Sequence, residues 1–374
     1  MTHYDTIVVG VGGMGSATAS HLANRGQDVL GLERYDVPHA QGSSHGVTRI
    51  IRKAYYEHPD YVPLLERAYD LWRELDDGHP TQLLHTTGCI VAGPEGSEKV
   101  AGARESCEKH DIDYELLSAA EINDRYSGYD LPEDFVAVVE PEGGFLHVEQ
   151  CVVAHVQSAL GNNAEIRARE AVLDWEPTPD DGVRVETDKA SYTTDTMVVT
   201  AGAWAANLLP TLEPRAVPER QVLGWFQPES PERYQSHSFP VFTVECEEGY
   251  FYGFPEYGVP GYKVGKYNHF REQVNPDEMA EPDQADERVL RDFTERYFPD
   301  AAGTTMRLET CLFTNSPDGH FIIDTLPDHP QVVVGAGFSG HGFKLSSVVG
   351  EILAELAIEG ESRHDIDLFS VNRF

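Results

Sequence analysis

The chain has 374 residues, enough for about two domains, and its net charge is −35, from 63 acidic and 28 basic residues. This excess of negative charge argues against binding to nucleic acids or to anionic membranes. No apolar run approaches the roughly 18 residues that span a bilayer, and the first residues lack the pattern of a secretory signal. We therefore expect a cytoplasmic protein without nucleic-acid or membrane partners.

The acidic residues gather in surface-like segments, such as residues 177–181 and 276–292. An acidic surface keeps a protein soluble. In molar salt, where the Debye length shrinks to about 3 Å, its self-repulsion is also screened. We favour adaptation to high salt over a merely solvating surface, and we expect low salt to destabilise the fold.

The scarce residue types also carry information. The five cysteines are scattered without CxxC spacing, so we expect neither a disulfide framework nor a zinc site, and no other pattern predicts a metal. Only seven residues are lysine, and three of them, Lys263, Lys266 and Lys344, lie beside glycine-rich or aromatic segments rather than on acidic helices. This placement favours a functional role for these three.

The N-terminal segment alternates between strand and helix patterns. Residues 6–9 predict a strand, 15–25 a helix and 29–32 a second strand, which together form a βαβ-type opening. Residues 41–46 are expected to form a loop, and residues 61–76 have the apolar spacing of a helix.

The middle of the chain is richer in strands, and its last segment is helical. Helices are predicted at residues 98–109, 148–160, 283–297 and 343–358. Strands are predicted at residues 87–92, 165–168, 171–175, 183–187, 196–200, 220–228, 241–245, 250–254 and 262–267, with strand and turn from 306 to 323.

These patterns predict an α/β (α+β two-domain) fold. A discontinuous, Rossmann-like dinucleotide-binding domain would take residues 1–85, 145–219 and 320–374. An antiparallel-sheet substrate domain would take residues 86–144 and 220–319.

The first glycine turn, at Gly10, Gly12 and Gly15, follows the first strand. Glycine allows a tight turn and a close approach to a pyrophosphate, and the following helix N-terminus favours negative charge. Glu33 ends the second strand, where an acid accepts hydrogen bonds from a ribose hydroxyl. The combination predicts a dinucleotide-binding site rather than a tight turn that binds no ligand. Glu33 also disfavours the 2′-phosphate of NADP.

A second glycine turn, at residues 335–344, follows the apolar residues 332–334. A helix that begins near Gly342 would aim its positive end at the flavin pyrimidine, where negative charge develops on reduction. Ordinary packing of small residues between strand and helix is the alternative. We favour one flavin held by both ends of the chain.

Several motifs carry a resemblance to a known family: Gly-Ser-Ser-His-Gly-Val-Thr-Arg-Ile-Ile-Arg at 42–52, Tyr-Gly-Phe-Pro at 252–255, Ser-Pro-Asp at 316–318 with Phe-Ile-Ile-Asp at 321–324, and residues 337–344. From about Tyr4 to Phe374, the chain resembles monomeric sarcosine oxidase and N-methyltryptophan oxidase, of the D-amino-acid-oxidase-like flavoproteins. The resemblance implies FAD and oxidation of a secondary (N-methyl) amino acid. Oxygen is reduced to hydrogen peroxide, and the imine is hydrolysed to amino acid and aldehyde.

The resemblance implies that Cys311 bonds covalently to the 8-methyl carbon of FAD. Attack by sulfur needs a thiol with a depressed pKa, and Arg307 is a cation near in sequence that would help. Without the resemblance, a buried structural thiol is the favoured interpretation.

The resemblance also assigns the cationic residues. Arg52 and Lys344 would hold the substrate carboxylate, because a guanidinium fork and an ammonium both bind carboxylates well. Arg49 would lie near the flavin, and Lys263 would promote the reaction with oxygen because a fixed positive charge stabilises superoxide. For any one of them, a surface ion pair of little consequence is the alternative.

Two departures from the family concern the pocket lining. The family often has histidine four residues after the oxygen-activating lysine, where this chain has Tyr267, with His269 two residues later. Phe313 stands where the family often has tyrosine. We take Tyr267 and His269 as candidate catalytic residues.

The remaining candidates come from the resemblance. Tyr55 and Tyr252 are candidate pocket aromatics, for which core packing is the alternative. The candidate cofactor-binding residues are Gly10, Gly12, Gly13, Met14, Gly15, Glu33, Arg34, Ser43, Ser44, Arg49, Val172, Ala201, Gly202, Trp204, Cys311, Gly337, Phe338, Gly340, His341, Gly342, Phe343 and Lys344.

The expected partners are a small amino acid and oxygen, and the expected assembly is a monomer or a small homo-oligomer. Four alternatives stay open. They are an FAD-dependent amino-acid dehydrogenase, an oxidase of cyclic imino acids such as pipecolate, a nicotinamide-dependent dehydrogenase and a non-catalytic flavin-binding protein.

Overall fold

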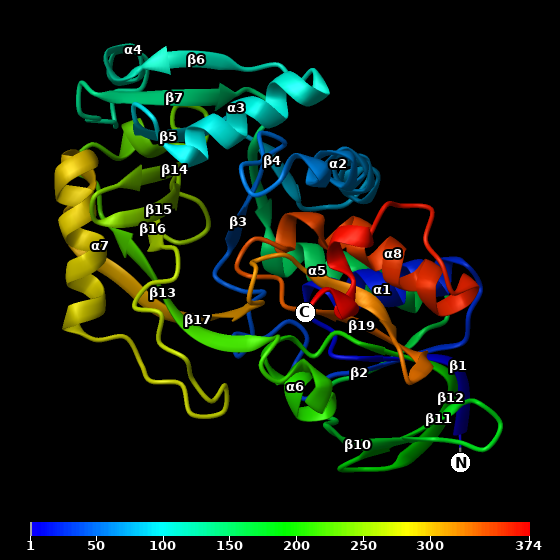
Figure 1. Cartoon of the computed structure of the whole chain (residues 1–374). Coiled ribbons are helices and arrows are strands. Elements are labelled where there is room, and N and C mark those ends of the chain that lie inside the picture. The colour runs from blue at the N-terminus through cyan, green and yellow to red at the C-terminus, as the bar shows by residue number, and fades with distance from the viewer. Residues whose placement is uncertain (1) are drawn as a thin grey trace.

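The computed structural model describes residues 2–374. Figure 1 shows a helix-covered sheet that carries both chain ends and a second sheet beside it, with helix α7 on the outer face of that second sheet. The helices are α1 (Gly13–Asn24), α2 (Val62–Asp76), α3 (Glu98–His110), α4 (Ala119–Arg125), α5 (Val148–Gly161), α6 (Ala205–Leu208), α7 (Gln284–Tyr297) and α8 (Ser346–Glu359).

The first sheet joins the two ends of the chain. Strand β12 pairs in parallel with β1 on one side and with β19 on the other, and β1 pairs in parallel with β2. The first and the last strands of the chain therefore lie in one sheet. The strands of this sheet are β1 (Thr2–Val9), β2 (Val29–Leu32), β9 (Glu165–Arg167), β10 (Val172–Pro177), β11 (Val183–Thr187), β12 (Ser191–Val199), β18 (Ile322–Leu326) and β19 (His329–Ala336).

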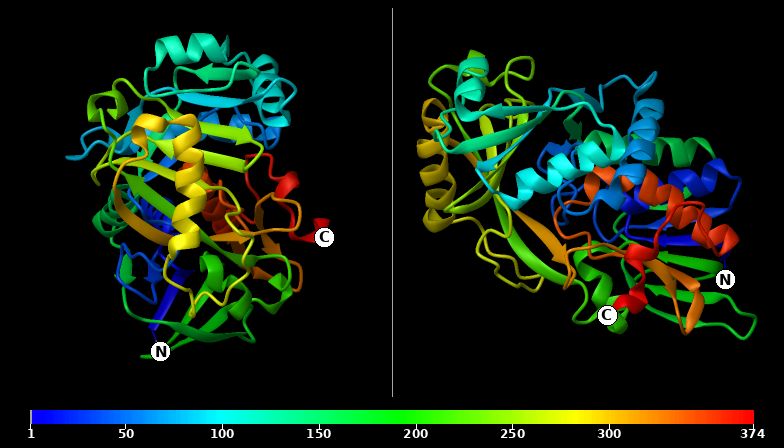
Figure 2. Two further views of the ribbon diagram at one scale, coloured as in Figure 1. Left: turned by 90° about the vertical axis from the view of Figure 1, so that its left-hand side faces the viewer. Right: turned by 45° about the horizontal axis from the view of Figure 1, so that its top comes forward.

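Helices α5 and α8 each pack against α1 over this sheet (Figure 2, right). The side of α1 that faces α8 is made of small residues, and a Cβ on Gly350 would stand 2.5 Å from the Cβ of Ala17. Because the two helices approach so closely, the glycine turn that precedes α1 is fixed relative to the turn that precedes α8.

The second sheet is antiparallel except for one pair, β5 with β14, which is parallel. Figure 2 (left) shows α7 in front of it, and Leu290 and Phe293 of α7 pack into the core on that face. The opposite face looks toward the first sheet. The strands are β5 (Cys89–Pro94), β6 (Glu115–Ser118), β7 (Phe135–Glu140), β13 (Val217–Phe226), β14 (Val241–Cys246), β15 (Gly249–Phe254), β16 (Tyr262–Lys266) and β17 (Thr305–Asn315).

A third, small sheet is formed by β3 (Thr48–Ile51), β8 (Gly144–His147) and β4 (Leu84–Thr86). The sequence patterns did not predict these strands, nor β6, β7 and α4. They are short and most of them pair with sequence-distant partners, so local periodicity carries little signal for them. The C-terminal helix also differs from the prediction, because Phe343–Leu345 forms a 3₁₀ turn before α8 begins.

The predicted division into two domains stays a prediction. All strands of the first sheet lie within residues 1–85, 145–219 and 320–374, the ranges predicted for the dinucleotide-binding domain. The strands of the second sheet lie within residues 86–144 and 220–319, the ranges predicted for the substrate domain, apart from the first residues of β13.

Among residues 2–374, no helix is long and apolar enough to cross a membrane.

Candidate active site

A cavity of about 370 Å³ opens at the carboxyl ends of β1, β2, β12 and β19. This edge of a parallel sheet is where α/β proteins bind their ligands. It brings together most of the predicted cofactor residues: Gly10, Gly12, Gly13, Met14, Glu33, Arg34, Ser43, Ser44, Arg49, Val172, Ala201, Gly202, Trp204, Gly337, Phe338, Gly340, Gly342 and Phe343.

The glycines of the first turn have different tasks. Gly10 has φ +90°, and a Cβ there would stand 2.7 Å from the carbonyl oxygen of Thr200. A Cβ on Gly15 would stand 1.8 Å from the carbonyl oxygen of Gly10, so Gly15 closes the turn and does not line the cavity. At Gly12 a Cβ would approach nothing closer than 3.8 Å, so the backbone itself faces open space there.

The N-terminus of α1 faces this open space. Its N-cap residue, Gly12, supplies no side-chain hydrogen bond, while the amide of Gly13 donates to Ser44 Oγ at 3.1 Å. Free N–H groups and the positive end of a helix favour a phosphate. The cradle of the first turn therefore fits the pyrophosphate of a dinucleotide.

Glu33 lies at the end of β2 and is 5 % exposed. Its carboxylate accepts hydrogen bonds from the amides of Val11, at 2.9 Å, and Tyr35, at 3.0 Å. Burial opposes ionisation, but the hydrogen bonds from His39 and these amides outweigh it and lower the pKa of Glu33. An ionised acid at this edge of the cavity is an acceptor for ribose hydroxyls.

Cys311 lies on β17 beside two cations. Burial by itself would raise the pKa of the Cys311 thiol, but the charges of His45 and Arg49 outweigh burial and lower it to about 7. The Arg49 guanidinium stands 3.4 Å from the sulfur. Arg307, which was expected to help, instead pairs with Glu309 at 2.6 Å. All three residues lie on one face of β17, and Glu309 stands between Arg307 and Cys311.

His45 links Cys311 to an acid. Its Nδ1 lies 2.9 Å from Glu309 Oε1. Burial would lower the pKa of His45, but the thiolate of Cys311 and the carboxylate of Glu309 raise it to about 9. Each charge in this buried group therefore stabilises the opposite charge beside it, and more of Cys311 is thiolate at neutral pH than of an ordinary cysteine.

A second, smaller cavity of about 70 Å³ adjoins the first, and Arg49, Phe313, Gly340 and Phe343 line both. Of the predicted site residues, the smaller cavity brings together Arg52, Tyr252, Tyr267, His341 and Lys344.

Arg52 already holds a carboxylate of the chain itself. Its guanidinium donates to both oxygens of Glu57, at 3.0 and 2.9 Å. Burial would raise the pKa of Glu57, but Arg52 outweighs it and lowers that pKa to about 2. Arg52 is itself buried and lies over the ring of Tyr56.

Lys344 is the second cation of the smaller cavity. Its Nζ donates to the carbonyl oxygen of His341 at 2.6 Å, and its own carbonyl accepts from Trp72 Nε1 at 2.8 Å. Burial, with the nearby charge of Arg52, lowers the pKa of Lys344 to about 7. An added carboxylate would favour the charged form.

Lys263 lies behind the cavity walls and lines neither cavity. Its Nζ donates to the carbonyl oxygens of Gly46, at 2.7 Å, and Thr48, at 2.9 Å, and to Thr48 Oγ1 at 3.0 Å. Three acceptors match the three protons of an ammonium group. Burial and the charge of Arg49 disfavour the ammonium form and lower the pKa of Lys263 well below its usual value.

Three other predicted site residues, Tyr267, His269 and Tyr55, differ in whether they reach the smaller cavity. Tyr267 lines the smaller cavity and its hydroxyl donates to the carbonyl oxygen of Ser339. His269 lies away from both cavities, where Nε2 stands 2.9 Å from Asp286. Tyr55 is buried behind the wall, and its hydroxyl stands 2.6 Å from His341 Nδ1.

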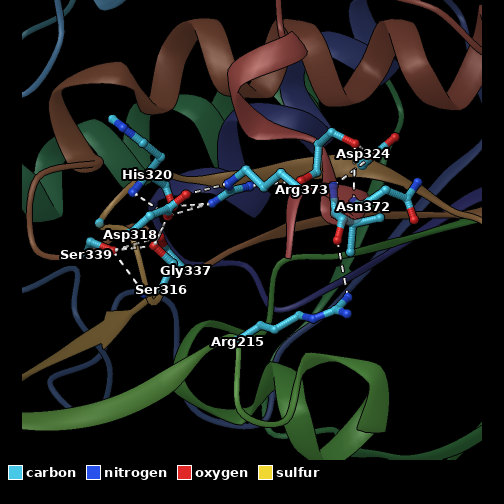
Figure 3. Close-up of polar contacts among 12 residues, drawn as sticks. Arg215, Ser316, Asp318, His320, Asp324, Gly337, Ser339, Asn372 and Arg373 are labelled. Carbon is cyan, nitrogen blue, oxygen red and sulfur yellow. Dashed lines mark hydrogen bonds and ion pairs between the residues drawn. The ribbon is translucent and has the colours of Figure 1, made fainter.

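Arg373, near the C-terminus, contacts the loop that holds His341, a residue that lines the smaller cavity. Figure 3 shows the Arg373 guanidinium reaching the carboxylate of Asp318, at 2.8 and 3.0 Å. In the same loop, the carbonyl oxygen of Gly319 stands 2.9 Å from His341 Nε2. The contact positions His341 and, through it, Tyr55.

Several residues of the site were not singled out by sequence reasoning. His45 stands in a quoted motif but had no role assigned. Glu57, Thr243 and Tyr250 line the smaller cavity or reach into it, and nothing in their local sequence indicates this.

The fold and the two cavities define a dinucleotide-binding protein with a small, cation-lined pocket beside the dinucleotide site. The model of the family described as FAD dependent oxidoreductase matches residues 5–356. The chain belongs to this family.

Individual relatives agree. The chain is 41 % identical over 380 residues to monomeric sarcosine oxidase of Bacillus sp. (strain NS-129), a match that covers 100 % of this chain and 97 % of that one. It is 36 % identical to N-methyl-L-tryptophan oxidase of Yersinia pestis (strain Pestoides F), over 99 % of both chains. The solved structure of NikD, an unusual amino acid oxidase essential for nikkomycin biosynthesis, has a TM-score of 0.84 at 26 % identity and covers 99 % of this chain and 98 % of that one.

Proposed function

We propose that this protein uses FAD to oxidise a secondary (N-methyl) amino acid, such as sarcosine, with oxygen as the electron acceptor. The observation that carries the proposal is the pair of buried cations, Arg52 and Lys344, in a small cavity that adjoins the dinucleotide cavity. FAD held in the larger cavity by the turn at Gly10 and Gly12 and by Glu33 would supply the redox chemistry, in which a C–H bond beside the amine would lose a hydride equivalent and oxygen would be the final acceptor.

Arg52 and Lys344 bind the substrate carboxylate in this scheme. Because Glu57 occupies the guanidinium of Arg52, the substrate carboxylate has to displace it or share Arg52 with it. Lys344, whose Nζ has only a carbonyl partner among residues 2–374, offers the second contact. The substrate amine binds without its extra proton, and the imine product is hydrolysed by water to amino acid and aldehyde.

The size of the cavity favours a small substrate. About 70 Å³ suits an amino acid with a short side chain. Eight of the lining residues are aromatic or histidine: Tyr56, Tyr250, Tyr252, Phe254, Tyr267, Phe313, His341 and Phe343. A substrate with an indole ring would require this wall to move. The cavity therefore supports sarcosine over N-methyltryptophan.

Anaerobic addition of sarcosine to the purified yellow protein tests the function. We expect the visible flavin colour to bleach, and we expect hydrogen peroxide to form when air is admitted. Bleaching without peroxide would favour the dehydrogenase alternative, and preferential bleaching by pipecolate would favour the cyclic imino acid oxidase. A colourless protein, or one that no secondary amine bleaches, would contradict the proposal.

We propose that Cys311 attaches FAD covalently, because the charges of His45 and Arg49 favour its thiolate. The bond replaces the thiol proton and one methyl hydrogen, and the two electrons released pass to oxygen. Cys311→Ser is expected to leave the yellow colour in the supernatant after acid precipitation, whereas the wild type keeps it in the pellet. Cys246→Ser, on a different strand, is the matched control and keeps the wild-type result. Colour in the supernatant of the wild type would contradict covalent attachment.

We propose that the protein works in the cytoplasm at high salt. Its charge of −35 produces self-repulsion that falls as the Debye length shortens from about 10 Å at 0.1 M salt to about 3 Å at 1 M. The melting temperature is expected to rise steadily between these two conditions. An osmolyte without charge, at equal osmolality, is the control and should not reproduce the rise. A melting temperature that does not respond to salt would contradict this proposal.

A further inference from the structure

The last residues of the chain fold back onto the loop of residues 316–321, which joins β17 to β18. Two carboxylates hold this segment (Figure 3). Asp324 of β18 accepts a hydrogen bond from the amide of Val371 at 2.9 Å. Asp318 of the loop accepts two from Arg373, from Nε at 2.8 Å and from Nη2 at 3.0 Å. We call the contact between Arg373 and Asp318 the C-terminal clasp.

The clasp differs from an ordinary surface ion pair in its geometry. Exposed ion pairs contribute little unless they are bidentate, as this one is, and the side chain of Arg373 is only 15 % exposed. Its guanidinium also donates to the carbonyl oxygens of His320, at 2.9 Å, and Ser370, at 3.0 Å. Burial would raise the pKa of Asp318, but the hydrogen bonds from Arg373 and from the amide of His320 outweigh it and lower that pKa to about 2.

The loop depends on this contact because its central residue is not held by packing. Gly319 has φ +79°, and a Cβ there would meet nothing within 4 Å. Glycine also loses more conformational freedom on folding than any other residue. Arg373 contacts Asp318 on one side of Gly319 and the carbonyl oxygen of His320 on the other. The clasp therefore fixes the position of the Gly319 carbonyl group.

This carbonyl oxygen orients His341, which lines the smaller cavity. It stands 2.9 Å from His341 Nε2, and because a carbonyl oxygen only accepts, Nε2 carries the proton. Burial lowers the pKa of His341 to about 4, so the ring is neutral, and Nδ1 accepts from the Tyr55 hydroxyl at 2.6 Å. The backbone carbonyl of His341 in turn accepts from Lys344 Nζ at 2.6 Å. A continuous series of contacts thus joins the clasp to the ammonium group of Lys344.

The larger cavity depends less on the loop. Ser339, in the second glycine turn, accepts from the amide of Ser316 at 3.1 Å. Its own amide donates to the carbonyl oxygen of Thr314 at 2.9 Å, and its hydroxyl donates to that of Gly337 at 3.1 Å. Thr314 belongs to β17, and Gly337 directly follows β19. These two contacts hold the turn independently of the loop.

We propose that the C-terminal clasp positions His341 and, through its carbonyl oxygen, the Lys344 ammonium group that receives the substrate carboxylate. Arg373 and Asp318 line neither cavity and act only through these contacts, so both are positioning residues. The inference rests on the proposed function and deepens it, because it makes the end of the chain part of the carboxylate site.

Two variants break the clasp from opposite sides, Arg373→Ala and Asp318→Asn. Each is expected to weaken the binding of methoxyacetate, a carboxylate without an amine to oxidise, by about three- to tenfold, which corresponds to one lost hydrogen bond. The dissociation constant is measured from the change in the visible flavin spectrum and needs no turnover. The double variant is expected to bind no more weakly than the weaker single variant, because both substitutions remove the same contact.

Asn372→Ala is the matched control. Asn372 precedes Arg373 directly, and its side chain is exposed and makes no hydrogen bond within residues 2–374. Its dissociation constant for methoxyacetate and its flavin content are expected to equal those of the wild type. The melting temperature and flavin content of every variant confirm that it is folded.

A second set of variants distinguishes positioning of Lys344 from a general loss of structure. In Lys344→Met the ammonium group is absent, so the clasp has nothing to position there. Arg373→Ala is therefore expected to change the dissociation constant of Lys344→Met by less than about twofold, although it weakens binding to the protein that keeps Lys344.

Three results would overturn the inference. The first is a wild-type dissociation constant in both Arg373→Ala and Asp318→Asn. The second is an equal loss from Arg373→Ala with and without Lys344. The third is a loss of flavin in both variants but not in Asn372→Ala, which would place the effect in the larger cavity. Failure of sarcosine to reduce the flavin of the wild type would overturn the proposed function instead, and the methoxyacetate titrations would still decide the role of the clasp.

Discussion

Replacement of Lys263 by methionine is expected to slow the reaction of the reduced enzyme with oxygen by about 10²–10³-fold, the usual cost of one lost charge-stabilising donor. The Lys263 ammonium is held by three acceptors, on Gly46 and Thr48, in a buried place where a fixed charge acts strongly. Superoxide forms first in this reaction, and methionine offers it no charge. Anaerobic reduction by substrate is expected to change little, so rapid mixing with substrate and then with oxygen separates the two steps.

Lys266→Met is the matched control for this prediction. Lys266 lies three residues farther along β16 and therefore points to the opposite face of the sheet, where its Nζ lies over the ring of Phe251. It is expected to retain the wild-type rate with oxygen. An unchanged oxygen rate in Lys263→Met would remove Lys263 from this role.

The pH dependence of the oxygen reaction provides a second readout. Burial and Arg49 lower the pKa of Lys263 well below its usual value, and the charged form exists below the pKa. The oxygen rate is therefore expected to fall as pH rises, at a lower pH than for an ordinary lysine. Lys263→Arg, whose guanidinium stays charged, should abolish this fall.

Lys344→Met is expected to weaken the binding of a substrate carboxylate by about 10–100-fold, the range for a lost charge-assisted hydrogen bond. Flavin content is expected to stay unchanged, because Lys344 lines the smaller cavity and not the larger one. Methoxyacetate, which has a carboxylate but no amine to oxidise, allows its dissociation constant to be measured from the change in the visible spectrum.

The same titration has a defined pH dependence. Because the pKa of Lys344 is about 7, the free enzyme carries the ammonium below that pH and must take up a proton to bind the carboxylate above it. Affinity should therefore fall by up to about tenfold per pH unit above this pKa. Lys344→Arg is expected to bind without this dependence. Equal dissociation constants in Lys344→Met and the wild type would exclude Lys344 from carboxylate binding.

Local sequence was sufficient for the dinucleotide end of the molecule. The requirement for glycine at Gly10 and Gly15 has a local part, because Gly10 has φ +90° and Gly15 packs against the carbonyl oxygen of Gly10. Glu33 follows its strand directly. The strands that precede the two glycine turns, β1 and β19, lie on either side of β12 in one sheet. Periodicity and turn chemistry are properties of neighbouring residues, so a sequence displays them.

The pocket was less predictable because its contacts join distant segments. Arg49 and Cys311 are 262 residues apart in the chain, and sequence proximity pointed instead to Arg307. The pairing of Glu57 with Arg52 spans only five residues, yet it depends on a turn with no repeating pattern. His269 follows the strand of Lys263 closely but turns away to Asp286.

The sequence by itself determined the dinucleotide-binding turns, the scarcity of lysine that drew attention to Lys263 and Lys344, and the acidity of the surface. Only the tertiary structure decided which cations surround Cys311 and that Glu57 pairs with Arg52 in the smaller cavity. The physical reason is that turn geometry depends on a few adjacent dihedral angles, whereas the charge and polarity of a cavity depend on strand register and on contacts across the whole chain.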